Sequence, residues 1–288
     1  LLAGGQLEQA CALARRGRAL WPEHTPLINN LSLGLSLLGQ QDAAVHMAQQ
    51  ALALNPNNLH ATANLVRYLV LQGQPDKARV VAKTLKGLPG APGEEDVAVK
   101  KAEALSYLGD DQGVVEICEA TPQDGDSPKD AWLQHLGAAA VLRLGDEVRA
   151  RRYWKRALVL DRSCAPARAN LDDLERPPGE REGPFALEFA AWIPRSTVEV
   201  LARIAKGSEA SARHAVRGYL KEHPALERLL PVLLERGDPD ARRLAMGVAL
   251  ITGMREADIC ALRVDRQVDD TILKMVISKS VAQVGAAL

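Results

Sequence analysis

The chain has 288 residues, of which 47% are hydrophobic and 25% are charged, so a disordered polypeptide is excluded and two domains or one elongated array can form. Aromatic residues make up only 3%, and Ala and Leu dominate the apolar set, which favours closely packed helices over a β-sheet. Basic and acidic side chains both number 36, so the net charge of zero gives no general attraction to nucleic acid or anionic lipid.

Cysteine spacing and hydropathy exclude two further classes. The cysteines Cys11, Cys118, Cys164 and Cys260 lie far apart and form no CxxC and no Cys/His cluster at metal spacing. We therefore expect buried free thiols in a reducing, cytoplasmic compartment, and neither a metal nor a cofactor. No apolar run reaches the ~18–20 residues that span a bilayer, so no membrane association is expected. The chain opens with Leu in mid-pattern, and we expect a piece of a longer protein.

From its start the chain repeats itself every 34 residues, the spacing of Gly5, Gly39 and Gly73. The other columns with this period are Ala10, Ala44 and Ala78, then Leu20, Leu54 and Leu88, then Pro22 and Pro56, and the dipeptides Asn30-Leu31 and Asn64-Leu65. Glycine ends a first helix and turns the chain, alanine lets a second helix approach closely, and proline stops the second helix. Such a hairpin cannot bury its apolar faces alone, so we expect hairpins to stack.

The pattern Gly39…Ala44…Ala51-Leu52-x-Leu54-x-Pro56 resembles the tetratricopeptide repeat family. The resemblance covers residues 1–175, about four to five repeats of which the first is incomplete. The spacing loosens to 36 residues after Gly73, and the unit at about 95–122 is degenerate, with Val114 where alanine is expected. The resemblance implies an all-α solenoid whose first helices line a concave surface that holds a peptide or a partner helix.

Two further segments follow this array. Residues 176–194 are a joint rich in Pro and Gly, and they hold both phenylalanines, Phe185 and Phe189, together with Trp192. Because a solvated linker rarely carries three large aromatic side chains, we expect the joint to pack against one or both arrays, with a flexible linker as the alternative. Residues 195–288 return to helical patterns, and the stretch LLPVLLERGDPDARRLA resembles HEAT-type repeats, as in uncharacterised bacterial tetratricopeptide proteins. That resemblance implies architecture only.

One passage near the end of the chain resembles the tyrosine recombinases of the phage integrase family. ALITGMREADICALRVD followed by VISKS places Arg255 where that family binds the scissile phosphate and Lys279 where it protonates the leaving group. Such enzymes also need a downstream tyrosine nucleophile, and the last tyrosine here is Tyr219. Apolar residues between 272 and 284 recur at helical intervals instead. We expect another helical pair and no enzyme, and the alternatives are a DNA strand-transfer fragment or a regulatory module of a larger protein.

The predicted groove supplies the candidate binding residues. Asn30 and Asn64 fall at matching places on successive first helices. Later in the chain, His135 and Asn170 occupy the equivalent places directly before a leucine. A side-chain amide can bond the backbone of an extended peptide without reading its sequence, since it offers both a donor and an acceptor. The alternative is that these amides satisfy local helix contacts. The candidate groove residues, including two arginines that add positive charge, are Asn30, Asn64, Arg67, His135, Arg168 and Asn170.

Charge is uneven along the chain although its sum is zero. Residues 103–147 are rich in acids, whereas residues 149–168 are rich in bases, and the basic run from Arg149 to Arg156 lies on a predicted second helix. A solvated face explains the basic run, and a docking patch for an acidic partner is the alternative. Nucleic-acid binding wants a broader basic stripe. We therefore expect a protein or peptide partner, with the oligomeric state left open.

Overall fold

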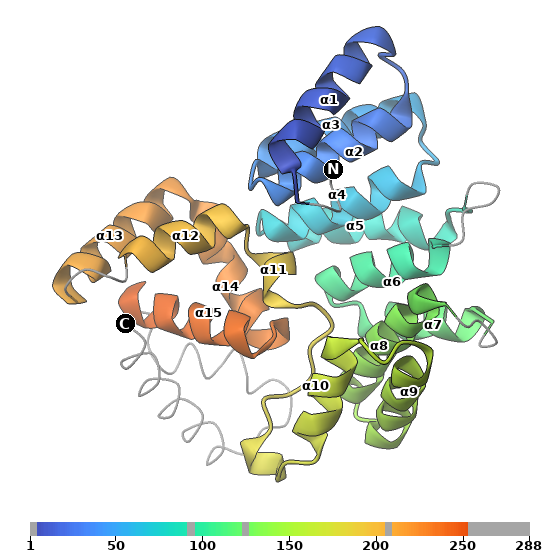
Figure 1. Cartoon of the computed structure of the whole chain (residues 1–288), viewed down its shortest axis with the longest axis vertical. Coiled ribbons are helices and arrows are strands. Elements are labelled where there is room, and N and C mark those ends of the chain that lie inside the picture. The colour runs from blue at the N-terminus through green and yellow to red at the C-terminus, as the bar shows by residue number, and fades with distance from the viewer. Residues whose placement is uncertain (1–4, 91–95, 123–126, 205–208, 253–288) are drawn as a thin grey trace. The chain divides into compact units, whose positions relative to one another are not determined.

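The computed structural model describes residues 5–90, 96–122, 127–204 and 209–252. Over these ranges the chain forms only helices, so the predicted all-α class is confirmed (Figure 1). The helices are α1 (Leu7–Leu20), α2 (Thr25–Leu37), α3 (Gln41–Leu54), α4 (Leu59–Leu71), α5 (Pro75–Gly87), α6 (Val97–Leu108), α7 (Asp111–Ala120), α8 (Pro128–Arg143), α9 (Glu147–Leu160), α10 (Ala165–Leu174), α11 (Phe189–Trp192), α12 (Arg195–Ile204), α13 (Glu209–Glu222), α14 (Pro224–Arg236) and α15 (Pro239–Thr252), with a short 3-10 helix at Pro178–Glu180.

The chain divides into two compact units. The first unit comprises residues 1–162 with 194–196, and the second comprises residues 163–193 with 197–288. The domain limits expected from the sequence, at residues 175 and 194, stay a prediction. Within the described ranges, no helix combines the length and the apolar character that crossing a bilayer requires.

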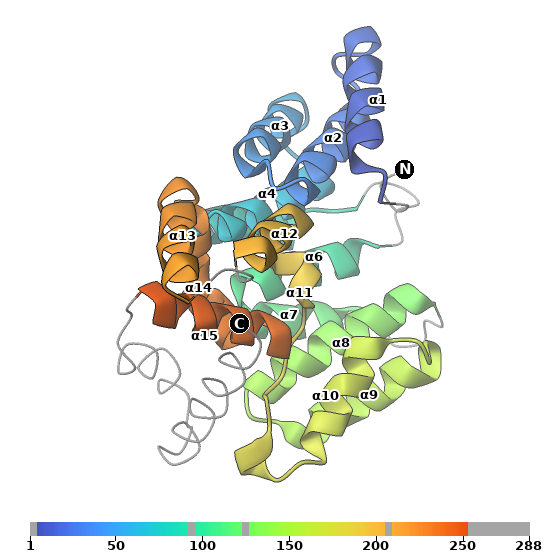
Figure 2. The ribbon, with the colours of Figure 1, turned by 60° about the vertical axis from the view of Figure 1, so that its left-hand side comes forward.

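The first unit is a stack of helical hairpins in chain order. The first helices α2, α4, α6 and α8 each pack against the second helix that follows them, which is α3, α5, α7 or α9. The second helices α3, α5 and α7 then contact the first helix of the next hairpin, and α1 takes the place of a second helix before α2 (Figure 1 and Figure 2). Consecutive first helices also touch one another, from α2 to α8. This sequential packing confirms the predicted solenoid for these helices.

The repeated glycines sit where the chain reverses between helices. Gly39, Gly73, Gly109 and Gly145 adopt positive φ angles of 79°, 68°, 77° and 96°, and Gly5 does the same before α1. After α2, the amide of Gln40 donates to the carbonyl of Leu35, which closes the helix end in a left-handed cap. Residues with a Cβ rarely adopt this backbone conformation, so glycine recurs in this column for a physical reason.

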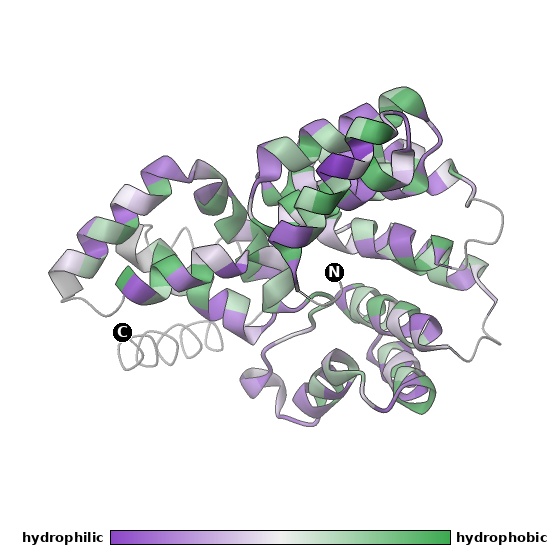
Figure 3. Cartoon of the chain, turned by 45° about the horizontal axis from the view of Figure 1, so that its top comes forward, coloured by the Kyte–Doolittle hydropathy of each residue, from purple (hydrophilic) through white to green (hydrophobic). Residues whose placement is uncertain are grey.

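The repeated alanine stands in the first half of the second helix of a hairpin. Ala44, Ala78 and Ala150 are completely buried. In the degenerate unit Val114 takes this place on the shorter helix α7 and is also completely buried, so the fold accommodates the larger side chain. Most helices carry both apolar and polar residues, in keeping with one face directed at a neighbouring helix (Figure 3).

In the second unit the joint after α10 is packed rather than solvated. Phe185 and Trp192 expose only 7% and 2% of their surface, and the indole of Trp192 donates to the carbonyl of Leu187. The guanidinium of Arg242 on α15 donates to three successive backbone carbonyls of the joint, those of Glu182, Gly183 and Pro184. A carboxylate at the α14–α15 turn, that of Asp238, accepts from the amide of Phe189 at 2.8 Å. These bonds fix the joint onto the α14–α15 pair.

The helical pair α14–α15 has the form expected for its HEAT-like sequence. Pro224 begins α14, and Leu226, Leu229, Leu230, Leu233 and Leu234 are the buried stripe of that helix. The side chain of Asp238 also accepts from the amide of Ala241 and so caps α15. The recombinase-like residues Arg255 and Lys279 lie outside the described residues.

Candidate functional site

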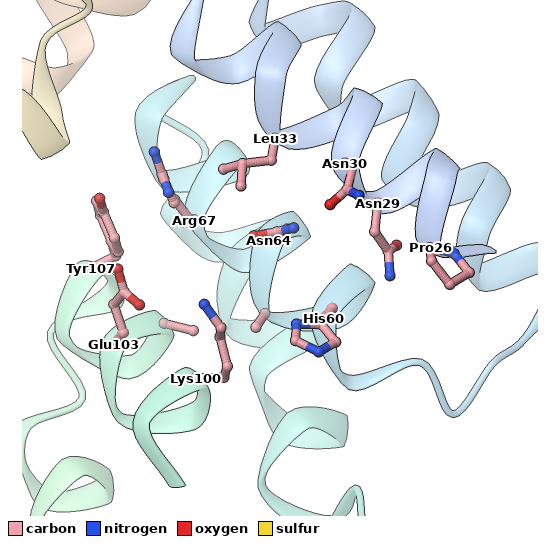
Figure 4. A pocket seen from close by; sticks show the side chains of 12 residues that line it. Pro26, Asn29, Asn30, Leu33, His60, Asn64, Arg67, Lys100, Glu103 and Tyr107 are labelled. Atoms are coloured by element: carbon pink, nitrogen blue, oxygen red, sulfur yellow. The ribbon is translucent and has the colours of Figure 1, made fainter. Parts of the chain in front are cut away.

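A polar groove of about 320 Å³ lies along the first helices α2, α4 and α6 of the first unit (Figure 4). The residues that line it from α2 are Pro26, Asn29, Asn30 and Leu33, and those from α4 are His60, Ala63, Asn64 and Arg67. Both sets stand 13, 10, 9 and 6 residues before the glycine that ends their helix. Steps of three, one and three residues select one face of an α-helix. The same helix face is therefore presented by successive repeats.

The third helix extends the same register with charged residues. Lys100 and Glu103 of α6 stand 9 and 6 residues before Gly109, so they are the counterparts of Asn64 and Arg67. These two residues are missing from the predicted site because the change of period from 34 to 36 residues hides them. Counting back from the glycine, instead of forward by a fixed period, is the signal that finds them.

Two amides in the groove are available to a ligand. Asn30 is exposed and Asn64 is half-buried, and neither side chain has a hydrogen-bond partner among the described residues. The neighbouring Asn29 is different, because its Nδ2 donates to Oδ1 of Asn58 at 3.2 Å. Asn58 in turn caps α4 by accepting from the amide of Ala61 at 3.0 Å. Asn29 therefore steadies the start of α4, while Asn30 and Asn64 can bind another molecule.

Arg67 lies with Tyr107 at one end of the groove, and Pro26 lies at the other (Figure 4). The guanidinium carbon of Arg67 stands 5.3 Å from the centre of the Tyr107 ring, and its Nε is buried with no hydrogen-bond partner among the described residues. Burial lowers the pKa of Arg67, but Tyr107, Tyr68 and Glu103 raise it by more, so the net shift is upward. Arg67 is therefore a permanent cation stacked on an aromatic ring.

Lys100 and Glu103 line the groove from α6, the first helix that packs next to α4. In Figure 4 the Lys100 side chain points toward Asn64, and the Glu103 carboxylate lies between Tyr107 and Lys100. Within the described part of the chain, neither forms an ion pair, and Arg67 forms none either. The groove thus has an amide end and a charged end.

His135 does not belong to this groove, contrary to the prediction. Its side chain is completely buried, and its Nδ1 accepts a hydrogen bond of 3.1 Å from the indole of Trp154. Alignment on the following leucine equates His135 with Asn30, but His135 stands 10 residues before Gly145, which is the place of Asn29. The true counterpart is Leu136, which is also completely buried. The row of polar groove residues therefore ends at α6.

Asn170 is also unavailable to a partner, contrary to the prediction, because the chain itself occupies it. The side chain is 2% exposed. Its Oδ1 accepts from the amide of Phe185 at 3.0 Å, and its Nδ2 donates to the carbonyls of Phe185 and Pro166 at 3.0 and 2.8 Å. The predicted Arg168 is exposed on α10 in the second unit, so it is not assigned to the groove of the first.

Comparison with known families gave a match to the Tetratricopeptide repeat at residues 37–88, the segment that contains α3, α4 and α5. These residues are therefore similar to a tetratricopeptide repeat. A comparison with curated proteins gave no match. Tetratricopeptide repeats are a protein-interaction module, and the family is typically non-enzymatic. Among the described residues, no group of three or more His, Cys, Asp or Glu side chains is arranged to hold a metal ion.

Proposed function

We propose that the tetratricopeptide repeats bind an extended segment of a protein partner in the groove formed by α2, α4 and α6. The observation that carries this proposal is the contact between Asn170 and Phe185. There one side-chain amide holds both the N–H and the C=O of a single residue in an irregular segment of the chain. Asn30 and Asn64 precede leucine on their first helices as Asn170 does, and they present the same group with no partner among the described residues.

The spacing of the helices suits an extended ligand. Packed helices lie about 8–10 Å apart, and an extended chain advances about 3.3 Å per residue. Asn30 and Asn64, on neighbouring helices, would therefore bond backbone groups about three residues apart. Because the bonds go to the backbone, the amides fix the path of the ligand without selecting its side chains. The proposal assigns no catalytic step, cofactor or metal to the groove.

The test is binding of the purified chain to an array of short random peptides, each acetylated at its N-terminus and amidated at its C-terminus. The best binder is then measured in solution by fluorescence anisotropy against the Asn30→Ala/Asn64→Ala variant. Each amide offers two hydrogen bonds at a net ~1 kcal/mol each, so the variant should lose tenfold or more in affinity. Asn57→Ala is the matched control, because Asn57 is exposed outside the groove.

Equal affinity of the double variant and the original chain for every peptide would remove the groove from consideration. The sequence left two alternatives, a DNA strand-transfer fragment and a regulatory module of a larger protein, and no observation on the described residues favours either. Arg255 and Lys279 lie outside them, so no observation favours a DNA strand-transfer enzyme.

A further inference from the structure

The charged end of the groove carries a net positive charge. Arg67 and Lys100 are two cations, and Glu103 is the carboxylate that lines the groove beside them. None of the three forms an ion pair within the described part of the chain. Lys86 on α5 is different, because it pairs with Asp110 at the start of α7 at 2.9 Å. Arg67 and Lys100 can therefore pair with a carboxylate of a ligand.

Both cations are placed to receive an anion. Arg67 is held over the Tyr107 ring, which reduces the conformational freedom that its side chain would lose on binding. Tyr107 is itself only 1% exposed, so this support is rigid. Lys100 reaches toward Asn64 from the neighbouring helix (Figure 4). A planar carboxylate is the group that a guanidinium binds best, through two parallel hydrogen bonds.

We propose that the bound segment is acidic, and that a Glu or Asp side chain of the ligand occupies the charged end of the groove beside Arg67 and Lys100. This inference rests on the proposed function. An acidic ligand residue adds selectivity to the groove. Amides that bond only the backbone accept a ligand in any register, whereas one ion pair fixes the register. Arg67 lies one helical turn from Asn64, so the acidic residue is close to the backbone group that Asn64 bonds.

Glu103 provides a sharp test of the acidic ligand. Its carboxylate repels the ligand carboxylate, whereas Arg67 and Lys100 attract the ligand carboxylate. Removing its charge should therefore strengthen the binding of an acidic ligand, whereas loss of a groove residue normally weakens binding. A merely structural role for Glu103 predicts the opposite sign. The charge effects should also fade with added salt, since they are electrostatic and partly exposed to solvent.

The experiment uses an array of short peptides, acetylated and amidated so that no terminal charge contributes, with one fixed central residue that is Glu, Gln or Lys. We expect the Glu series to be enriched over the Gln series, and the Lys series to be depleted. For the best Glu peptide, Arg67→Met and Lys100→Met should each lower the affinity about fivefold, and Glu103→Gln should raise it about twofold. The Gln version of that peptide should respond little to any of the three.

Matched controls separate charge from folding. Lys83→Met and Glu227→Gln remove the same charges from exposed sites outside the groove and should leave the affinity unchanged. Because Arg67 packs on Tyr107, Arg67→Lys and a salt titration of the unmodified chain provide measurements that do not depend on the Met variant folding. Binding that depends on Asn30 and Asn64 but is equal for Glu, Gln and Lys peptides would overturn the acidic ligand and leave the groove intact. Absence of any peptide binding would overturn both.

Discussion

The indole Nε1 of Trp154 donates a hydrogen bond of 3.1 Å to Nδ1 of His135, and both side chains are completely buried where α9 packs on α8. A nitrogen that accepts this bond carries a lone pair, so His135 is held in one tautomer. The hydrogen bond joins the two helices of one hairpin. It is a packing feature, which is why a histidine near the groove register contributes nothing to the groove.

The first prediction concerns this pair. His135→Leu should lower the free energy of unfolding by about 2 kcal/mol, because it leaves the Trp154 N–H buried without its acceptor. The measurement is urea unfolding followed by circular dichroism. Adding Trp154→Phe in the same chain should cost less than the sum of the single changes, since no donor then remains unsatisfied. Peptide affinity of the folded variant should stay unchanged, and a loss of affinity would return His135 to the binding site.

The second prediction concerns the repeated glycines. Gly145 has φ +96° and no atom within 4 Å of the place where a Cβ would stand, so Gly145→Ala tests the backbone conformation alone. We expect a loss of about 1–2 kcal/mol in unfolding free energy. Gly218 also has open space around it but lies inside α13 at an ordinary helical φ, so Gly218→Ala should be neutral or stabilising by up to about 1 kcal/mol. Equal effects of the two changes would contradict the positive-φ explanation.

The third prediction concerns the anchoring of the joint. Arg242 is 7% exposed and donates to carbonyls of the joint, so Arg242→Met should leave those carbonyls without their donor and free the segment from α15. Hydrogen exchange followed by mass spectrometry should show faster exchange over residues 182–190. The next residue, Arg243, is 41% exposed by its side chain, pairs with Asp240 and lies 4.0 Å from the Glu182 carboxylate, so Arg243→Met should change this exchange less than Arg242→Met does. Unchanged exchange in both variants would show that the joint is held by other contacts.

The fourth prediction concerns alkaline pH. Burial raises the pKa of Tyr68 and Tyr107 to about 12, from the ordinary value of 10.0. Because the folded pKa lies above the unfolded one, the folded state retains a proton that the unfolded state loses, and this stabilisation is present below pH 10 and declines toward pH 12. Each tyrosine should cost about 2–3 kcal/mol of stability across that interval. In Tyr107→Phe, the fall in unfolding free energy between about pH 9 and pH 11 should be smaller than in the original chain, and an identical fall would contradict the assignment.

The glycine column shows how far local sequence reaches. Gly39 and Gly73 predict the turns because only glycine adopts positive φ without strain, and this requirement acts within a few residues. Ala44 and Ala78 predict the close approach of two helices because their side chains are small, and both are completely buried. The same register places Asn30, Asn64 and Arg67 on one face of their helices.

Burial and occupancy, by contrast, depend on residues far away in the chain. Sequence gives Asn30 and Asn170 the same neighbour, leucine, yet one amide is exposed and the other is covered by Phe185. His135 is directed inward because Trp154 supplies a donor from the next helix.

The sequence alone thus predicts the repeat, its turns and its helix faces, because backbone conformation and helical period are local properties. Only the tertiary structure decided which helix face becomes an open groove and that the row of polar groove residues ends at α6. The physical reason is that exposure is set by what packs against a residue, and those partners come from other helices.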